Sequence, residues 1–409
     1  MFTKKYKNEV LFHYLDRLID KQAFENKKIV LFGLNASSFA TKKYLDEKGY
    51  DVFAYIDNDE DKVLQAQENV LEVFPRHIRK TDCNNNSNSI ISAYKPEDLL
   101  LPFQDDYIIL ISSKYYPDML QQLSEMGYEA NVHVFKPIDF HEIDSVLVDE
   151  EDIKGLKVMD ADSIRKKQLE IVSYVVDVCK RHNLNIYMGG GTLLGAVRHS
   201  GYIPWDDDVD LILPMNDYKM LTKIILEEDV YDIYNTYVDP DCSNFFSRII
   251  DRNTIVKRWS YPTMTTSGVD IDVFPLSGVP KRMHEISKFY NRLHCLNRMY
   301  AATMPHNAEQ TPEILARRSN LRKSIIEMTE EYDFYQSEIA AYLLSKYKEK
   351  DLMARSVFDE TVYLKFEDLE LPAPAGYDVY LEYLYGDYMT LPSKKEQYAP
   401  HNYKAFYKN

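Results

Sequence analysis

Short apolar runs alternate with stretches of helical period in the first third of the chain. "IVLFGL" (Ile29 to Leu34) is an apolar run with a glycine near its end, "SSFATKKYLDEKG" has serine caps and helical spacing, and "DVFAYIDND" has the composition of a second strand. "YIILISS", "YPDMLQQLSEMG" and "VHVFKP" repeat the order of strand, helix and strand. This rhythm predicts a Rossmann-like α/β domain with a parallel sheet and right-handed crossovers.

A second pattern, which predicts an α+β domain, follows after residue 160. "ADSIRKKQLEIVSYVVDVCKRHN" is predicted to be a long helix, and "LNIYMGG" a strand. We expect further strands at "DLILP" and "GVDIDVFPL", a helix from Asn216, and amphipathic helices that cover a sheet between His284 and Asp351. The apolar positions that set the period of the long helix are Ile164, Leu169, Val172, Val176 and Cys179.

An acidic run, "VDEEDIKG" (Val148 to Gly155), separates the two patterns and has the composition of a linker. A chain of 409 residues is too long for one ordinary core, so two or three domains are expected. We therefore predict a Rossmann-like domain over residues 1–150 and a second domain over residues 151–409. "TDCNNNSNS" (Thr81 to Ser89) is a polar loop within the first domain.

Composition and charge exclude several classes of protein. The formal net charge of −16 argues against a general nucleic-acid binder, which needs a surplus of Lys and Arg to displace counterions from phosphates. The four cysteines form no CxxC pair, so neither a zinc site nor a disulfide scaffold is indicated, and a reducing cytoplasm fits best. The start of the chain has basic residues and only broken apolar runs, so we do not expect it to act as a signal peptide. The apolar run Tyr107 to Ile111 is far below the roughly 20 residues of a spanning helix. We expect a cytoplasmic protein that is not integral to a membrane, with any membrane association arising through its acceptor.

The first domain has the frame of a dinucleotide site without its glycines. Gly33 ends a strand, and an acidic residue, Asp57, ends the next one, but "GLNASS" stands where G-x-G-x-x-G is needed. "KGYDVFAYIDND" resembles the small Rossmann-like domains at the front of sugar-modifying transferases. The resemblance leaves two roles open, one structural or acceptor-binding and the other the binding of a nucleotide or sugar nucleotide, and it disfavours redox chemistry.

Four carboxylates stand in five positions, Asp206 to Asp210, behind the glycine-rich stretch "GGGTLLGAVRHSGYIPW". An EF-hand requires Gly at its sixth position and Glu at its twelfth, where this chain has Leu211 and Asp217, so that reading fails. A solvated acidic turn would not need the alternation of carboxylate and apolar residue that Asp208 begins. A metal site explains the crowding, because a dication makes adjacent carboxylates mutually tolerable.

The remaining interpretation is a metal-dependent phosphoryl-transfer site. Two carboxylates on one strand, Asp208 and Asp210, would hold Mg2+, with Mn2+ as an alternative, and "VDIDVF" would supply Asp270 or Asp272 from a second strand. Asp272 is the preferred third ligand and candidate general base, with Asp270 as the alternate, while Asp206 and Asp207 are less clearly assigned. The turn before the acidic strand would present backbone N–H groups to a phosphate, and its residues are Gly190, Gly191 and Thr192.

Together these features form the pattern of the polymerase-beta type nucleotidyltransferase fold. "GGTLLGAVRHSGYIPWDDDVDL" resembles the signature of the LicD family, whose members are related to fukutin-related transferases and share this fold. "FSRIIDRNT", "IDVFPL" and "FEDLELPAPAGYDVYLEYLYGDYMTLP" follow in the family's order, so that the resemblance covers about residues 165 to 405. The residues from Tyr385 to Met389 and His401 match the family without a derivable role.

The resemblance implies a phosphotransferase. LicD proteins move phosphocholine from CDP-choline to a sugar hydroxyl of a glycan such as teichoic acid, lipopolysaccharide or capsule, and relatives move other phospho-alcohols such as glycerol or ribitol phosphates. The expected partners are a CDP-activated donor and a glycan or lipid-linked glycan acceptor. Further substrate-binding candidates, which lie near the motifs, are Arg198, His199, Trp205 and Arg248. The candidates for an aromatic cage around choline are Tyr202, Trp205, Trp259 and Tyr261.

Two other classes of function compete with this one. A D-x-D glycosyltransferase would explain Asp208 and Asp210 but neither the glycines nor the second carboxylate strand. A scaffold with a decayed catalytic domain is disfavoured because every carboxylate of the pattern is present.

Overall fold

The computed structural model describes residues 3–5, 13–67, 92–111, 116–137, 153–260, 263–304, 310–345, 351–393, 397 and 402–408. The chain divides into two compact units. The N-terminal unit comprises Lys4–Lys154 and Trp259–Met264, and the C-terminal unit comprises Met1–Thr3, Gly155–Arg258 and Thr265–Asn409. The predicted polar loop at Thr81 to Ser89 and residues 148–152 of the predicted linker lie outside the described residues.

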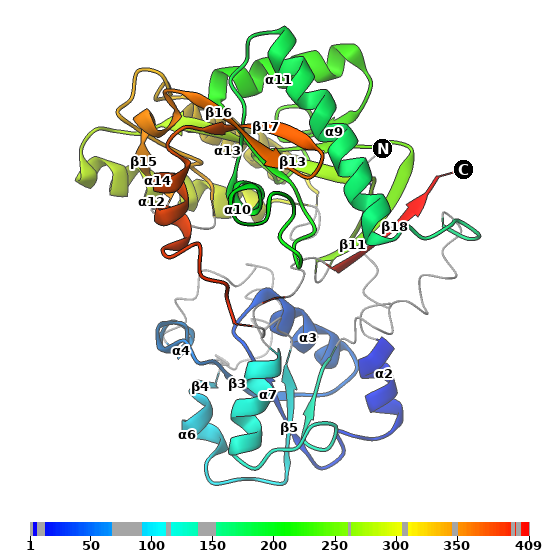
Figure 1. The fold of residues 1–409 in the computed structure, drawn as a ribbon. Helices are drawn as coiled ribbons and strands as arrows, with labels where there is room; N and C mark the ends of the chain where they lie inside the picture. The colour runs from blue at the N-terminus through cyan, green and yellow to red at the C-terminus, as the bar shows by residue number, and fades with distance from the viewer. Residues whose placement is uncertain are drawn as a thin grey trace. The chain divides into compact units, whose positions relative to one another are not determined.

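The N-terminal unit is built on a five-stranded sheet whose neighbouring strands are all parallel, in the order β4-β3-β2-β5-β6 (Figure 1). Every residue of β5 is buried, as is typical of a parallel strand covered on both faces. This sheet confirms the predicted Rossmann-like α/β architecture. Its strands are β2 (Lys28–Phe32), β3 (Val52–Ile56), β4 (Ala93–Tyr94), β5 (Tyr107–Ile111) and β6 (Val134–Phe135). Its helices are α2 (His13–Asp20), α3 (Ala36–Glu47), α4 (Glu60–Gln67), α6 (Pro96–Leu100) and α7 (Tyr116–Glu125).

The turn between β2 and α3 is closed by its own side chains. Gly33 has a φ of 111°, which favours glycine. The Asn35 side chain accepts a hydrogen bond from the Ser38 N–H at 3.0 Å, and the buried Asp57 carboxylate accepts one from the Leu34 N–H at 2.6 Å. A pyrophosphate at this turn would need such N–H groups and would meet the Asp57 charge. The geometry therefore argues against dinucleotide binding at this turn.

The C-terminal unit contains a mixed seven-stranded sheet. Its main path runs β15-β14-β13-β10-β9 with antiparallel neighbours, while β8 pairs in parallel with β13, and β7 pairs antiparallel with β8. The strands are β7 (Tyr187–Met188), β8 (Asp210–Pro214), β9 (Asp232–Tyr234), β10 (Ser247–Ile250), β13 (Asp270–Gly278), β14 (Ile339–Ala341) and β15 (Met353–Ala354). This mixed sheet, together with its helices, confirms the predicted α+β character.

Smaller strands and seven helical segments complete the described part of the C-terminal unit. β16 (Thr361–Phe366) and β17 (Leu369–Pro374) form a two-stranded sheet, and β12 (Thr263–Ser267), β11 (Thr254–Ser260) and β18 (Asn402–Tyr407) are neighbours in another. A short strand, β1 (Thr3–Lys5), is the first described element of the chain. The helical segments are α9 (Ala161–Arg181), α10 (Gly190–His199), α11 (Met215–Glu228), α12 (Met283–Ala301), α13 (Pro312–Thr329), η3 (Arg355–Phe358) and α14 (Tyr377–Tyr385).

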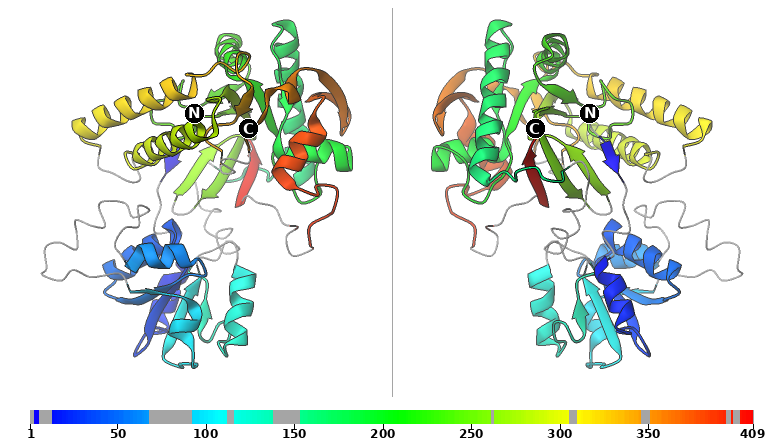
Figure 2. Two further views of the ribbon diagram at one scale, coloured as in Figure 1. Left: turned by 90° about the vertical axis from the view of Figure 1, so that its left-hand side faces the viewer. Right: turned by 90° about the vertical axis from the view of Figure 1, so that its right-hand side faces the viewer.

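The long helical region predicted from His284 to Asp351 is only partly helical. Helices α12 and α13 pack against each other around a shared apolar core (Figure 2). The prediction is wrong beyond α13, because Ile339–Ala341 forms β14 and extends the sheet beside β13. A buried strand of three residues has too few positions for its period to be distinguished from that of a helix.

The long helix predicted at the start of the second pattern is α9. Ile164, Val172 and Cys179 are buried on it, and Leu169 and Val176 are partly buried against the same core. Among the described helices, none is long and apolar enough to cross a membrane. The cysteines in the described residues are all free thiols.

Candidate active site

A cavity of about 510 Å³ opens in the C-terminal unit beside β8 and β13. One part of its lining is acidic and the other is aromatic and apolar. Its acidic residues are Asp206, Asp208, Asp210, Asp272 and Asp351. The other residues of its lining are Gly190, Gly191, Ile212, Phe246, Phe274, Leu276, Tyr342, Leu344, Ser345, Met353, Tyr380, Leu384 and Tyr385.

The pairing of β8 with β13 brings two of the predicted carboxylates together. The two strands run in parallel, and their register places Asp210 directly beside Asp272. The Asp272 N–H donates to the carbonyl of Val209 at 2.9 Å, which fixes this register at the start of β8. Because neighbouring strands lie about 4.8 Å apart, side chains that share a register and a face of the sheet are adjacent. Asp210 at the start of β8 and Asp272 on β13 therefore form one acidic surface, whereas Asp208, predicted to share a strand with Asp210, lies in the loop before β8.

The glycine turn lies against these carboxylates and leaves room for them. A β-carbon on Gly190 would lie 2.9 Å from Asp210 Oδ2, and one on Gly191 would lie 2.6 Å from Asp206 Oδ2. Gly190 also has a φ of 45°, and its N–H donates to the Tyr380 hydroxyl at 3.1 Å. Any larger residue in this turn would displace a carboxylate of the cavity.

Thr192 holds the first turn of α10 against the start of β8. Its side-chain oxygen accepts a hydrogen bond from the Asp210 N–H at 2.8 Å, and its side chain is buried. The Gly189 N–H donates to the Asp210 carbonyl at 2.9 Å. Thr192, predicted to bind substrate, is thus bonded to the backbone of the residue that carries the Asp210 carboxylate.

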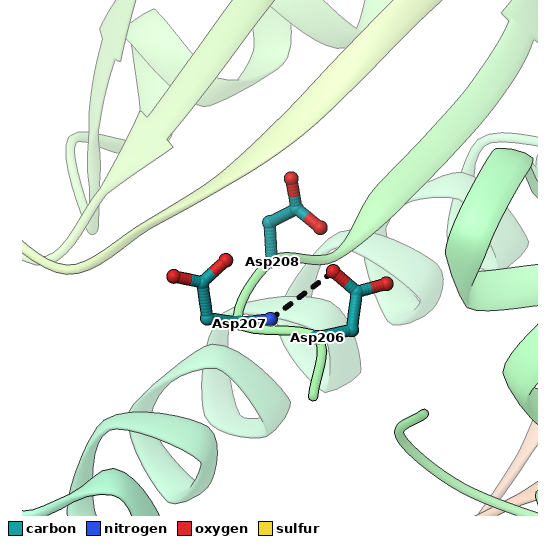
Figure 3. A group of neighbouring side chains, drawn as sticks. All are labelled: Asp206, Asp207 and Asp208. Carbon is teal, nitrogen blue, oxygen red and sulfur yellow. Dashed lines mark hydrogen bonds between the residues drawn. The ribbon is translucent and has the colours of Figure 1, made fainter. Parts of the chain in front are cut away.

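The loop before β8 gathers three further carboxylates (Figure 3). Asp206, Asp207 and Asp208 each place a carboxylate oxygen so that the three atoms lie within 4.8 Å of one another. The Asp207 N–H donates to Asp206 Oδ1 at 3.2 Å, the bond drawn in Figure 3. Asp206 and Asp208 belong both to this group and to the lining of the cavity. The structure thus adds Asp206 to the carboxylates that sequence analysis favoured.

Helix α9 holds this loop in position through backbone hydrogen bonds. Arg165 donates to the Asp206 carbonyl at 3.1 Å, and the buried Gln168 amide donates to the Asp207 carbonyl at 3.0 Å. Tyr202 donates to Gln168 Oε1 at 3.1 Å and packs on Phe366. The acidic loop is therefore held from outside the cavity through its backbone carbonyls, which keeps its carboxylates close together.

Two of the cavity carboxyl groups have a pKa above the ordinary value of Asp. Burial raises the pKa of Asp206 from 3.8 to about 7, and the neighbouring charge of Asp208 contributes to that rise. Burial also raises the pKa of Asp272 to about 6; Arg248 opposes this rise, and Asp270 adds to it. A divalent cation would favour the ionised form of both.

Two arginines direct their charge to the carboxylates of β13. Arg258 binds Asp270 through two hydrogen bonds, of 3.1 and 2.8 Å, and both side chains are almost fully buried. The Nε atom of Arg248 lies 3.3 Å from Asp272 Oδ1 and 3.8 Å from Asp270 Oδ2. Asp270, predicted as an alternate metal ligand, is therefore engaged by Arg258, and Asp272 is the one of the pair that lines the cavity. Arg248, predicted to bind the donor, supports Asp272.

Three other substrate-binding candidates, Arg198, His199 and Trp205, lie together near the end of α10. Arg198 donates to the His199 ring at 3.0 Å and to the Tyr388 carbonyl at 2.9 Å. The His199 ring lies edge-on to Trp205, with 6.2 Å between the ring centroids. These three residues are in the described part of the chain, and they are not among the residues that line the cavity. The hydrogen bond from Arg198 to Tyr388 connects the end of α10 to the segment after α14.

Sequence analysis did not identify the aromatic lining of the cavity. The rings of Phe246, Phe274 and Tyr342 form a row, and α14 adds Tyr380 and Tyr385. Phe274 was detectable, because it stands two residues after Asp272 on the same strand. Of the aromatic residues that were proposed, Tyr202 and Trp205 do not line the cavity, Tyr261 lies outside the described residues, and so does the side chain of Trp259. His401 also lies outside them.

The donor set fits a hard divalent cation. The acidic part of the described lining offers carboxylate oxygens, the ligand type that Mg2+ and Mn2+ prefer over imidazole or thiolate. Asp206, Asp208, Asp210 and Asp272 are the residues that would hold such an ion.

Comparison with known proteins agrees with this site. The sequence model of a family described as "LicD/FKTN/FKRP, nucleotidyltransferase domain" matches residues 183–306, which include the glycine turn and both acidic strands. Lipopolysaccharide cholinephosphotransferase LicD of Haemophilus influenzae is 28% identical over 267 residues, which cover 60% of this chain and 98% of that protein. Ribitol 5-phosphate transferase FKRP of Homo sapiens is 46% identical over 48 residues, which cover 12% of this chain and 10% of that protein.

The matched residues carry the elements that build the cavity. β7, α10, β8, β10 and β13 all lie within residues 183–306, and the similarity to the Haemophilus protein extends over nearly the whole length of that relative. Over residues 183–306, the chain is therefore similar to the nucleotidyltransferase domain of the LicD/FKTN/FKRP family, whose named relatives above are transferases.

Proposed function

We propose that the C-terminal unit transfers phosphocholine from CDP-choline to a hydroxyl group of a cell-surface glycan or its lipid-linked precursor. Lipopolysaccharide, teichoic acid and capsule are the acceptor classes that fit the proposal, and the cytoplasm is the compartment that fits it. The observation that carries the proposal is the adjacency of Asp210 and Asp272 beside the glycine turn, at one end of a cavity large enough for a small donor. The name of the Haemophilus relative, which is matched over 98% of its length, supports phosphocholine as the transferred group.

The reaction would be an in-line displacement at phosphorus. The acceptor hydroxyl oxygen forms a new bond to the phosphorus that carries choline, the bond from that phosphorus to the bridging oxygen breaks, and CMP leaves with the electron pair. The hydroxyl proton passes to a base, for which Asp272 is the candidate because it lies at the acidic end of the cavity. Atoms and charge balance without a further reactant.

The chain's own residues would position the donor. A bound Mg2+ ion would supply charge neutralisation for the diphosphate at the carboxylates of β8 and β13. The glycine turn would allow the backbone of α10 to approach the donor closely. Arg248 and Arg258 would keep the β13 carboxylates in place rather than contact the donor directly.

A second donor class has one specific observation in its favour. The stretch that is 46% identical to ribitol 5-phosphate transferase FKRP is short, but it indicates that a phospho-polyol such as ribitol or glycerol phosphate is an alternative transferred group. The chemistry at phosphorus would be the same.

A donor panel tests the proposal. The purified chain is incubated with Mg2+, a lipopolysaccharide or teichoic acid acceptor, and CDP-choline, CDP-glycerol or CDP-ribitol in turn, and CMP release is measured. We expect acceptor-dependent CMP release with CDP-choline. CMP release only with CDP-glycerol or CDP-ribitol would show that the proposed donor is wrong. Release of UDP from a UDP-sugar would show that the proposed reaction is wrong and that the chain transfers a glycosyl group.

A further inference from the structure

A row of aromatic rings begins immediately behind the acidic end of the cavity. Phe246 and Phe274 have ring centroids 4.7 Å apart, and Phe274 and Tyr342 have centroids 4.9 Å apart. All three line the cavity that Asp272 also lines. Phe246 directly precedes β10, Phe274 lies on β13, and Tyr342 directly follows β14. The three rings form one aromatic wall of the cavity, and no single sequence motif contains all of them.

The distance between the aromatic wall and the carboxylates matches the length of a choline group. Asp272 and Phe274 stand two residues apart on β13, where side chains share a face of the sheet about 7 Å apart, and both are partly open where their neighbours on the strand are buried. In choline, three single bonds of about 1.5 Å separate the phosphoester oxygen from the nitrogen. A phosphate bound at the carboxylates would therefore place a choline head group near the rings.

The aromatic part of the cavity also carries a negative charge. Asp351 lines the cavity and is buried, at 7% exposure. Burial raises the pKa of Tyr342 well above its ordinary value, and the charges of Asp272, Asp351 and Asp210 add to the rise. The Tyr342 hydroxyl thus lies within the field of carboxylates from both strands and of Asp351. The described lining contains five Asp residues and no Lys, Arg or His, and the nearby Arg248 guanidinium lies 5.9 Å from the centroid of the Phe246 ring. The excess of carboxylates favours a cationic ligand group, and the position of Arg248 shows that a cation is accommodated at these rings.

The chemistry of the wall discriminates between the candidate donors. A polyol needs hydrogen-bond partners for each hydroxyl, and Phe246, Phe274, Leu344 and Met353 offer none from their side chains. A quaternary ammonium group needs no hydrogen bond and is attracted to aromatic faces and to a carboxylate. The wall is therefore suited to a methylated ammonium group rather than to a polyol.

We propose that Phe246, Phe274, Tyr342 and Asp351 form a binding site for the quaternary ammonium group of the donor, and that this site selects phosphocholine over phospho-polyols. The inference rests on the proposed function for its donor, but it concerns residues to which neither the family match nor the named relatives assign a role. Phe246 and Phe274 lie within the matched residues, whereas Tyr342 and Asp351 lie outside them.

Binding and turnover measured separately test the proposal. Isothermal titration calorimetry with Mg2+ gives the Kd of CDP-choline and of CDP-glycerol for the wild-type chain and for Asp351→Asn, Tyr342→Leu and Tyr342→Phe. We expect the wild-type chain to bind CDP-choline about tenfold more tightly than CDP-glycerol. Asp351→Asn and Tyr342→Leu should lose most of this preference, whereas Tyr342→Phe, which retains the ring, should keep it. Asp359→Asn, an exposed position that is paired with Arg355 and does not line the cavity, is the matched control.

A competition experiment does not depend on any variant. Tetramethylammonium chloride should weaken the binding of CDP-choline but not of CDP-glycerol, and NaCl at the same ionic strength should weaken neither selectively. Equal binding of the two donors by the wild-type chain, or a preference that survives in both Asp351→Asn and Tyr342→Leu, overturns the ammonium site. A lack of CMP release from CDP-choline, with the binding preference present, overturns the proposed reaction and leaves the ammonium site supported.

Discussion

Replacement of Gly191 by alanine is expected to disturb the geometry of the site while leaving the stability of the fold almost unchanged. A β-carbon at this position would lie 2.6 Å from Asp206 Oδ2, and the next atom it would meet, Asp206 Cγ, lies at 3.8 Å. Ordinary contact begins at 3.4 Å, so the oxygen must move by about 0.8 Å. Because this oxygen is the end of a flexible side chain, it can rotate away while the backbone stays in place.

The expected magnitudes differ for stability and for activity. Gly191 is the second residue of α10, and a Gly to Ala change in a helix stabilises by roughly 0.5–1 kcal/mol, which offsets the rotation of Asp206. We expect the Tm of Gly191→Ala to stay within about 3 °C of the wild-type value. A displacement near 1 Å in a reacting site costs up to about a hundredfold in rate, so kcat/KM for CMP release should fall roughly 10- to 100-fold.

Gly195→Ala is the matched control for Gly191→Ala, with Tm measured by thermal shift and CMP release by a coupled assay. Its β-carbon would lie 2.4 Å from the carbonyl oxygen of Gly201, a backbone atom that cannot rotate away, so this variant should lose stability first. Wild-type kcat/KM in Gly191→Ala would refute the assignment of Asp206 to the site. If Gly191→Ala lowered the Tm as much as Gly195→Ala does, the argument that the Asp206 side chain can rotate away without loss of stability would be refuted.

Two further predictions concern the carboxylates themselves. Arg258→Met removes the arginine that donates two hydrogen bonds to the buried Asp270 carboxylate. The free energy of unfolding in urea should fall by about 3 kcal/mol. A fall of less than about 1 kcal/mol would show that the ion pair is dispensable for stability. The pKa of Asp206 is raised from 3.8 to about 7 by burial and by Asp208, so its contribution to stability in metal-free buffer is fully present below about pH 4 and is lost as pH rises to about 7. Between about pH 4 and pH 7 with EDTA present, the change of Tm with rising pH should therefore be less negative, or more positive, in Asp206→Asn than in the wild-type chain, and an unchanged slope would contradict the shift.

The sequence was sufficient to predict the carboxylate strands, because each carries its own local signal. Alternation of Asp with apolar residues indicates a strand with one polar face, and it predicts strands from Asp208 and from Asp270. β13 begins at Asp270, but β8 begins at Asp210, so the prediction is wrong for Asp208, which lies in the loop before the strand. The register that opposes Asp210 to Asp272, and the choice of Asp272 over Asp270 for the cavity, depend on how β8, β10 and β13 align, and no local pattern encodes that alignment.

The aromatic end of the cavity could not be predicted for the same reason. Tyr342 follows a strand of three residues, Asp351 precedes one of two, and Tyr385 ends a helix far along the chain, so their meeting is a property of tertiary packing. The group that Arg248 contacts could not be predicted from the sequence either, because a basic residue near an acidic site can contact the donor or the carboxylates. The structure directs it to Asp272.

The central claim is that the carboxylates of β8 and β13 act with a divalent cation in phosphocholine transfer, and a magnesium titration tests it most directly. CMP release from CDP-choline with a glycan acceptor is followed as Mg2+ is added to the wild-type chain, to Asp210→Asn, and to Asp217→Asn, a partly buried Asp that accepts a hydrogen bond from Tyr335 and does not line the cavity. We predict saturable, EDTA-reversible activity in the wild-type chain and in Asp217→Asn, and a loss of roughly a thousandfold in Asp210→Asn with Tm retained. Turnover in Asp210→Asn at the wild-type rate and with the wild-type dependence on Mg2+ would contradict the claim.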